Sequence, residues 1–600
     1  MRHGIVPGAA APWLAHLQPM MNTTWRTAAA CLAAGLMMMG CAHAPVGAPD
    51  MQRATTFGAV VGSDDAAASG TWSWKGVPFA APPVGALRWR APADPQPWAQ
   101  PRDATRFASA CVQTGRLYGP GLHNRYDETI GQTLGKTLGS EDCLYLNVWT
   151  PASVPAQPRP VIVWVHGGSN ITGYTADPVY DGAHLARTAD AVVVSVPYRL
   201  GIFGFLDSPV LKTGDADSDS GNFALLDILQ GLRFVQRNIA AFGGDPRNVT
   251  LMGQSSGAVN VYALLASPMV AAMQPAPFHR LIALSGGISS AATLPPGAFS
   301  VVRPLAGWRR QGDALLAQSL IADGLAADAG AAQAYVAAHT QQQLAAYLRG
   351  RSADALLATV HARLARMGLA ASNPIPDGHV LPADPIAGIR AGRYVRVPVL
   401  AGNTRDETKL FPSLLALRPS LGGKSGRLLD DAAVFKLAAH YDPDGPPATR
   451  IEDWIPPQYL PVDAPGTGYD ARTDALNRVW FLPYRDDVLD ALKSRQQAVW
   501  YYRFDWDELP APFDAIYGAA HTFDLPFVFG NFGPSLYANI MFSRANEPGR
   551  LALSKAMMGS VAAFARSGDP NTPALGTRWN PWPARLSFDA DRRQARISSR

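Results

Sequence analysis

The sequence has little cysteine, little charge and no long apolar run. Its composition argues against a disordered or coiled-coil protein, a nucleic-acid partner and a membrane span. Charged residues make up 16% of the chain, but 55 Gly and 51 Pro point to a globular protein rich in loops, not a disordered or coiled-coil one. The net charge of +5 is not gathered in any Lys/Arg stripe, so nucleic acid is not an expected partner. The apolar run at residues 27–39 is shorter than the about 20 residues of a membrane span.

That N-terminal run predicts an export signal. Arg26 precedes it and Gly40-Cys41 ends it, which resembles a bacterial lipoprotein signal in which Cys41 is acylated and becomes the first residue. We therefore expect residues 1–40 to be a signal peptide and residues 41–600 to be the mature protein, with a net charge of +3 after loss of Arg2 and Arg26. The protein would be periplasmic or tethered to a membrane through the lipid alone.

Other interpretations of the N-terminus stay open. Cleavage after Ala42-His43-Ala44 would give a freely secreted protein, and the segment could also be a plain tail. Translation could start at Met20 or Met21 instead of Met1. The oligomeric state cannot be inferred from the sequence.

Two of the four cysteines, Cys31 and Cys41, belong to the predicted signal, which leaves Cys111 and Cys143. In an exported chain the oxidising compartment favours a disulfide between them. Two buried free thiols are the alternative.

Strand-like and helix-like segments alternate along the chain. Residues 55–150 contain short β-like runs between Pro/Gly turns, which predicts antiparallel strands in the N-terminal part of the sheet (an antiparallel opening). Buried strands are predicted at 160–165, 191–196, 249–252, 278–284, 397–401 and, as the last one, 498–504; helices are predicted at 225–239 and 258–265, and a helical cap at 313–367. The sequence predicts an α/β fold with a large, mostly parallel twisted sheet, helices on both faces and helical cap insertions.

The sequence Gly-Gln-Ser-Ser-Gly at 253–257 matches the nucleophile elbow, in which a serine lies on a sharp strand-to-helix turn flanked by glycine. The pattern is weak alone, but a predicted strand precedes it and a predicted helix follows it. The helix N-terminus would then point its dipole at a developing oxyanion. Ser255 is therefore the candidate nucleophile.

A serine nucleophile needs a histidine base and an acid that orients the histidine. In α/β-hydrolases these follow the serine in the order acid, then histidine, and His521 is the one histidine beyond His440. Asp406 and Glu407 follow a predicted strand, and either carboxylate could serve on chemistry alone. For the oxyanion, the candidate donors are the N–H groups of Gly168 and Ser169, after the strand at 160–165, and that of Ser256.

These pieces together resemble the type-B carboxylesterase family, which includes bacterial para-nitrobenzyl esterases and animal cholinesterases. Ser-Glu-Asp-Cys-Leu-Tyr-Leu-Asn-Val at 140–148 matches one family motif, and Phe-Gly-Gly-Asp-Pro at 242–246 with the elbow matches another. The segments 76–88 and 521–530 resemble further family blocks. The likeness extends from about residue 58 to residue 583.

The resemblance implies the α/β-hydrolase fold and hydrolysis of small-molecule carboxylic esters through an acyl-enzyme on a Ser255–His521–Glu407 triad, with no cofactor or metal. It selects Glu407 over Asp406, because the family acid is the Glu of Asp-Glu-Gly, although Thr408 replaces the glycine here. It also implies a Cys111–Cys143 disulfide, an Arg88–Glu141 ion pair and a role for Ser285 near the triad.

Several positions depart from the family pattern, and other functions stay open. Gln254 stands where Glu is frequent, and Ser169-Asn170 stand where Gly-Phe is common. None of these changes removes a catalytic atom. The same triad could hydrolyse amides or carbamates, and some relatives are non-catalytic binding modules. The natural substrate, with its acyl and alcohol preference, cannot be determined from the sequence.

Overall fold

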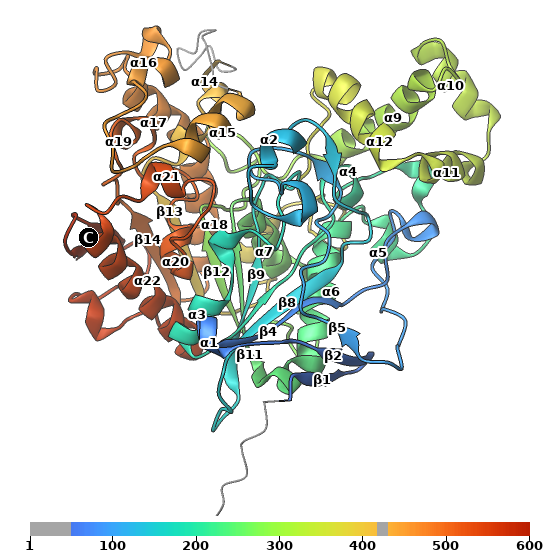
Figure 1. The fold of residues 1–600 in the computed structure, drawn as a ribbon. Coiled ribbons are helices and arrows are strands. Elements are labelled where there is room, and N and C mark those ends of the chain that lie inside the picture. The colour runs from blue at the N-terminus through green and yellow to red at the C-terminus, as the bar shows by residue number, and fades with distance from the viewer. Residues whose placement is uncertain (1–49, 417–429) are drawn as a thin grey trace, which may run out of the picture. The chain divides into compact units, whose positions relative to one another are not determined.

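An eleven-stranded sheet organises residues 50–416 and 430–600, the part of the chain that our computed structural model describes (Figure 1). The predicted signal peptide and Cys41 lie outside these residues. The strand order is β16-β15-β14-β13-β12-β11-β9-β10-β8-β4-β3. No helix within the described ranges has both the length and the apolar content needed to cross a bilayer.

The middle of the sheet is parallel and its two ends are antiparallel, as predicted for a mostly parallel sheet with an antiparallel opening. The parallel strands are β10 (Val192–Ser195), β9 (Arg159–Val165), β11 (Gly244–Gln254), β12 (Arg280–Leu284), β13 (Val399–Thr404), β14 (Val499–Phe504) and β15 (Leu586–Ala590). The antiparallel strands are β3 (Ser63–Asp65), β4 (Thr71–Pro78) and β8 (Tyr145–Pro151) at one end and β16 (Ala595–Ser599) at the other.

Both faces of the central strands are buried, which explains their continuous apolar sequences. In β9, Val161 and Val163 belong to one hydrophobic core, while Ile162 and Trp164 belong to the other. Helices α6 (Phe223–Asn238) and α7 (Ser256–Ala266) contribute to the first core, and helices α3 (Ala183–Ala189), α20 (Leu525–Phe529) and α22 (Glu547–Ser567) to the second. The sheet is therefore covered by helices on both sides.

The prediction that 498–504 forms the last strand is wrong, because β15 and β16 extend the sheet beyond β14. Each is only five residues long. The sequence of β15, Leu-Ser-Phe-Asp-Ala, mixes polar and apolar residues, and β16 is partly exposed along its length. Neither therefore has the continuous apolar run that marks a central strand.

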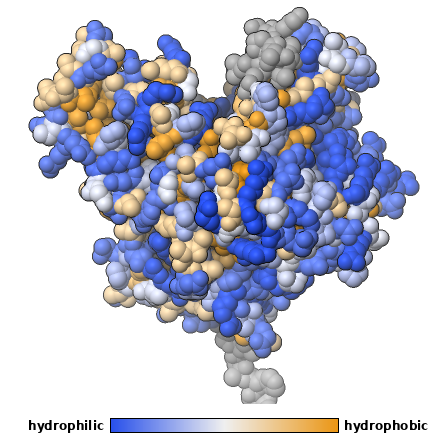
Figure 2. All heavy atoms as spheres, turned by 180° about the vertical axis from the view of Figure 1, so that it is seen from behind, coloured by the Kyte–Doolittle hydropathy of each residue, from blue (hydrophilic) through white to orange (hydrophobic). Residues whose placement is uncertain are grey.

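The predicted helical cap is present and begins earlier than expected, at Leu305 instead of residue 313. It contains α9 (Leu305–Ala322), α10 (Ala329–Ala338), α11 (Gln341–Gly350) and α12 (Ala353–Thr359), which lie together in Figure 1. Its own hydrophobic cluster packs Leu315 and Leu348 with Phe203 of the main body. Apolar side chains also gather on the outer surface of the cap, as Figure 2 shows.

Candidate active site

Ser255 lies at the turn between β11 and α7 in a backbone conformation that L-residues rarely adopt, with φ 55° and ψ −124°. Its flanking glycines are required by space. A Cβ on Gly253 would lie 2.5 Å from the carbonyl oxygen of Gly257, and a Cβ on Gly257 would lie 2.3 Å from that of Val165. The Ser255 N–H donates to the Leu284 carbonyl of the neighbouring β12, at 2.8 Å. The elbow is therefore built as the motif predicts.

Glu407 and His521 are in direct contact. Glu407 follows β13 and His521 follows α19 (Phe513–Tyr517), and His521 Nδ1 lies 2.5 Å from Glu407 Oε2. The other oxygen, Oε1, accepts hydrogen bonds from Asn403 Nδ2 at 2.8 Å and from the Thr404 N–H at 3.0 Å. Glu407 is fully buried. A carboxylate only accepts hydrogen bonds, so in this contact the imidazole donates through Nδ1–H, and Nε2 is the ring nitrogen left for other partners.

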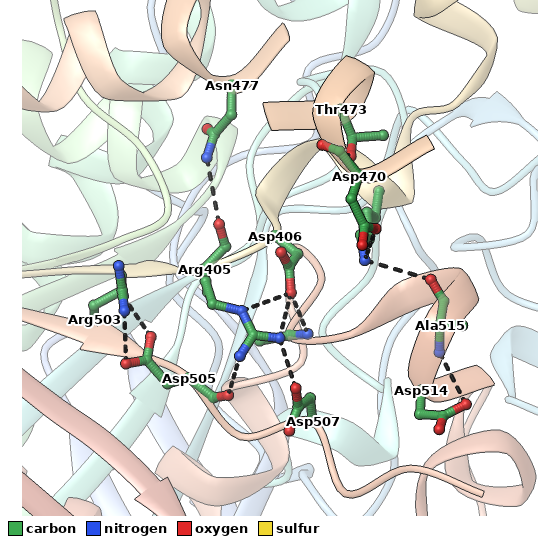
Figure 3. A network of polar contacts seen from close by, with 12 residues as sticks. Arg405, Asp406, Asp470, Thr473, Asn477, Arg503, Asp505, Asp507, Asp514 and Ala515 are labelled. Atoms are coloured by element: carbon green, nitrogen blue, oxygen red, sulfur yellow. Dashed lines mark hydrogen bonds and ion pairs between the residues drawn. The ribbon is translucent and has the colours of Figure 1, made fainter. Parts of the chain in front are cut away.

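Asp406, the other carboxylate that the sequence offered, does not contact His521. Its Oδ2 accepts hydrogen bonds from Arg405 Nη2 at 2.8 Å and from the Ala519 N–H at 3.0 Å. Figure 3 shows the Arg405 guanidinium between Asp406 and Asp507, whose Oδ2 lies 2.7 Å from Nη2. Asp406 therefore joins the loop at residues 405–408, which carries Glu407 (the acid loop), to the loop at residues 518–522, which carries His521 (the histidine loop). It does so without contacting the imidazole.

The candidate donor loop follows β9 and has three consecutive residues with positive φ: Gly168 at 107°, Ser169 at 54° and Asn170 at 58°. The N–H groups of Gly168 and Ser169 have no hydrogen-bond partner within the described ranges. The Asn170 N–H donates to Ser256 Oγ at 3.0 Å, which ties the loop to the first residue of α7. The two free N–H groups, of Gly168 and Ser169, are two of the three that the sequence proposed for an oxyanion, the third being that of Ser256.

His166 supports this loop and is not placed to act as a base. Burial lowers the pKa of His166 to about 4, so its ring is neutral at neutral pH. The ring stacks on Tyr198, with centroids 4.7 Å apart, and the Tyr198 hydroxyl donates to the His166 carbonyl at 2.9 Å. A Cβ on Gly173 would lie 2.4 Å from His166 Nδ1, so that glycine is required by packing.

Ser255, His521 and the donor loop line one cavity of about 360 Å³.

Two predicted features outside this cavity are confirmed. Cys111 and Cys143 form a disulfide, and Arg88 Nε donates to Glu141 Oε2 at 2.6 Å. Ser285 is buried at the end of β12, and its hydroxyl has no hydrogen-bond partner among the described residues.

Sequence reasoning missed several residues of the site. The Gln254 side-chain nitrogen lies 3.1 Å from His521 Nε2, although the motif comparison marked Gln254 only as a departure. Phe411 and Phe481 place their ring centroids 5.2 and 5.0 Å from the imidazole. These two aromatic residues lie outside every motif found in the sequence, so no local signal could have identified them.

Comparison with known proteins gives one consistent result. The model of the carboxylesterase family matches residues 49–594. The chain is 32% identical over 535 residues to the para-nitrobenzyl esterase of Bacillus subtilis, covering 88% of this chain and 91% of that protein. It is 31% identical over 594 residues to the fumonisin B1 esterase of Sphingopyxis macrogoltabida, covering 96% of this chain and 92% of that protein.

Solved structures agree with the sequence comparisons. A para-nitrobenzyl esterase structure superposes with a TM-score of 0.66 at 28% identity, covering 92% of this chain and 97% of that one. A Geobacillus stearothermophilus carboxylesterase superposes with a TM-score of 0.64 at 27% identity, with the same two coverages. The likeness therefore covers most of this chain and nearly all of each solved structure.

Proposed function

Because the chain belongs to the carboxylesterase family and is a carboxylic ester hydrolase, we propose that it acts through an acyl-enzyme formed on Ser255, with His521 as general base and Glu407 as its orienting acid. The contact between His521 Nδ1 and Oε2 of the buried Glu407, at 2.5 Å behind a cavity that Ser255 and His521 line, is the observation that carries this proposal. A buried carboxylate on Nδ1 holds the tautomer whose Nε2 can accept the serine proton.

In the acylation half, Ser255 Oγ attacks the ester carbonyl carbon while its proton passes to His521 Nε2. The carbonyl oxygen becomes an anion, which the N–H groups of Gly168, Ser169 and Ser256 would stabilise. The carbon–oxygen bond to the alcohol then breaks, and His521 returns the proton to the departing alkoxide. Glu407 stabilises the imidazolium while it exists.

In the deacylation half, a water molecule replaces the alcohol. His521 removes a proton from the water as the oxygen attacks the acyl carbon, and the same donors stabilise the second oxyanion. The bond to Ser255 Oγ then breaks, the serine regains its proton from His521, and the carboxylic acid leaves. The positive φ values of the donor loop support this role, because they keep its N–H groups out of regular structure.

Replacing the nucleophile tests the proposal. We expect Ser255→Ala to lower kcat on a simple aryl ester by on the order of a million-fold, because the nucleophile and base act as one unit. Ser567→Ala, at the exposed end of α22, is the matched control and should keep wild-type kcat. An organophosphate should label Ser255 in the wild-type protein, as read by peptide mass spectrometry. Near-wild-type activity of Ser255→Ala, or a label on another serine, would refute the assignment.

A further inference from the structure

The cavity above Ser255 has an unusual wall. Of the described residues that line it, nine are aromatic and seven of these are tyrosines. Aromatic faces pack well against another flat ring. Each phenol also brings a hydroxyl that needs a partner once water is excluded. The wall therefore favours a ligand with an aromatic ring, and its polar atoms select the substituents that the ring carries.

Most of these hydroxyls already have partners. The Tyr180 hydroxyl donates to the Tyr174 carbonyl at 3.0 Å, and the Tyr469 hydroxyl donates to the Lys409 carbonyl at 3.3 Å. The Tyr537 hydroxyl donates a hydrogen bond to the Tyr118 hydroxyl at 2.5 Å. Among the described residues the hydroxyls of Tyr126, Tyr174 and Tyr517 have no hydrogen-bond partner, and Tyr174 is the most deeply buried of these three. Tyr174 is only 2% exposed, and its hydroxyl has no hydrogen-bond partner among the described residues. A buried phenol without a partner is unfavourable, so a ligand acceptor that reaches this hydroxyl would be stabilised by it.

Asp177 lies three residues further along the same wall and interacts electrostatically with Tyr126, Tyr174 and Tyr180. One oxygen, Oδ1, accepts the Val179 N–H at 2.9 Å. Burial raises the pKa of Asp177 to about 6, and no cation is paired with it in the described part of the chain.

The other charged residues of the cavity wall are paired. Arg116 lies 3.8 Å from Asp431, Lys409 lies 2.8 Å from Asp470, and His521 contacts Glu407. Asp177 is therefore the one lining carboxylate in the described ranges whose charge is not balanced by an ion pair. An acceptor at Asp177 and a donor at Tyr174 stand on one wall.

We propose that Tyr174 and Asp177 form a subsite for a hydroxyl group on an aromatic ring, so that hydroxyaryl esters are a preferred substrate class. This inference rests on the proposed function. A hydroxyl can accept from the Tyr174 phenol and donate to Asp177, which satisfies both groups at once. An ammonium group only donates and leaves the Tyr174 proton without an acceptor. A methyl group leaves both wall groups unpaired, and a site of that kind discriminates against it.

Two matched ester pairs test the subsite, one with the ring on the alcohol side and one with the ring on the acyl side. The first pair is 4-hydroxyphenyl acetate and 4-methylphenyl acetate. The second is methyl 3-(4-hydroxyphenyl)propanoate and methyl 3-(4-methylphenyl)propanoate. Within each pair hydroxyl replaces methyl at nearly equal size and carbonyl reactivity. We expect kcat/KM to favour the hydroxyl member by tenfold or more in at least one pair.

Variants then assign the preference. Tyr174→Phe keeps the ring, and Asp177→Asn keeps the bond to the Val179 N–H, so both should fold; each should bring the hydroxyl-to-methyl ratio close to one while the methyl ester is still hydrolysed. Asp431→Asn, which removes a paired carboxylate from the same wall, should keep the wild-type ratio.

The proposal is overturned by a ratio near one in both wild-type pairs, or by a ratio that survives both substitutions. It is also overturned if the 4-(aminomethyl)phenyl analogue of the propanoate is preferred to the hydroxyl ester and that preference disappears in Asp177→Asn. Failure of the proposed function looks different, because the wild-type enzyme would then hydrolyse no member of either pair, or Ser255→Ala would hydrolyse them as well as wild type.

Discussion

Gln254 contacts the proposed base, His521, at a position where the family pattern frequently has Glu. Its amide nitrogen lies 3.1 Å from His521 Nε2, the atom that must accept the Ser255 proton. A neutral amide that donates to Nε2 stabilises the neutral imidazole. A carboxylate at the same position would stabilise the imidazolium instead. Gln254 must also give up this contact when Ser255 uses Nε2.

We therefore expect Gln254→Glu to shift the acidic limb of the kcat/KM profile to higher pH. The active form needs an unprotonated His521, and a negative charge beside Nε2 holds the proton to higher pH. Gln254→Met, of similar size but without a donor, should give a smaller shift in the same direction. The measurement is kcat/KM for an aryl ester from pH 5 to pH 9. Three superimposable profiles would show that the amide does not act on His521.

Ser169 combines a proposed oxyanion donor with a strained backbone. Its φ of 54° is a region that favours glycine, yet a serine occupies it. The resemblance to other carboxylesterases points to glycine at this place, so this chain adds a Cβ and a hydroxyl beside the proposed oxyanion donors. The free N–H of Ser169 is kept despite the side chain.

At the scale of elements, two loops that are far apart in sequence must hold Glu407 against His521. The Asp406 N–H donates to the Ala519 carbonyl at 2.9 Å, and the Asp406 carboxylate accepts the Ala519 N–H at 3.0 Å. Gly518 makes this approach possible, since a Cβ there would lie 2.4 Å from Asp406 Oδ2. Asp406 is therefore a positioning residue that fixes the acid loop to the histidine loop.

Asp406→Ala should lower kcat on an aryl ester by about ten- to a hundredfold with little change in KM, since small displacements of catalytic groups have effects of this size. Asp406→Asn retains an oxygen for the Ala519 N–H and should recover most of the activity. The control is Asp505→Ala, which breaks the neighbouring Arg503–Asp505 pair seen in Figure 3 but leaves the histidine loop untouched. Equal losses of kcat in Asp406→Ala and the control, matched by equal losses of stability, would argue for a purely structural role.

At the scale of the whole molecule, the disulfide closes the segment between Cys111 and Cys143, which forms part of the cavity wall. Cys111 and Cys143 are 32 residues apart in sequence, and the segment between them supplies Tyr118 and Tyr126 to the cavity. The cap also binds this segment, through Thr114 Oγ1 with His361 Nε2 at 2.7 Å and Thr137 Oγ1 with Asp354 Oδ1 at 2.6 Å. The segment closed by the disulfide therefore contributes to the cavity wall and also contacts the cap.

The double variant Cys111→Ser/Cys143→Ser should lower the free energy of unfolding by about 3 to 4 kcal/mol, because the closed loop restricts the unfolded chain. Urea unfolding of the variant and of the oxidised wild-type protein measures the difference. Wild-type protein unfolded in the presence of a reductant serves as the control and should match the variant. An unchanged midpoint would mean that the disulfide contributes no net stability.

Much of the fold and of the candidate site could be predicted from the sequence, because the signals are local. The strand predicted at 160–165 became β9 at Arg159–Val165, and the helix predicted at 225–239 became α6 at Phe223–Asn238. Continuous apolar runs and helical periodicity depend only on neighbours along the chain. The short, mixed strands β15 and β16 escaped prediction because pairing with β14, not their own composition, places them in the sheet.

By itself the sequence determined the fold class and located the nucleophile elbow at Ser255, since a strand–turn–helix with flanking glycines is a local requirement of backbone space. It also proposed His521 and the donor loop, from chain order and from their places after predicted strands. Only the tertiary structure could assign different contacts to Asp406 and Glu407, which are adjacent and chemically alike. Glu407 meets His521, while Asp406 meets Arg405 and the Ala519 N–H. The contact of Gln254 with His521 was likewise decided by packing between distant segments, for which a linear pattern carries no signal.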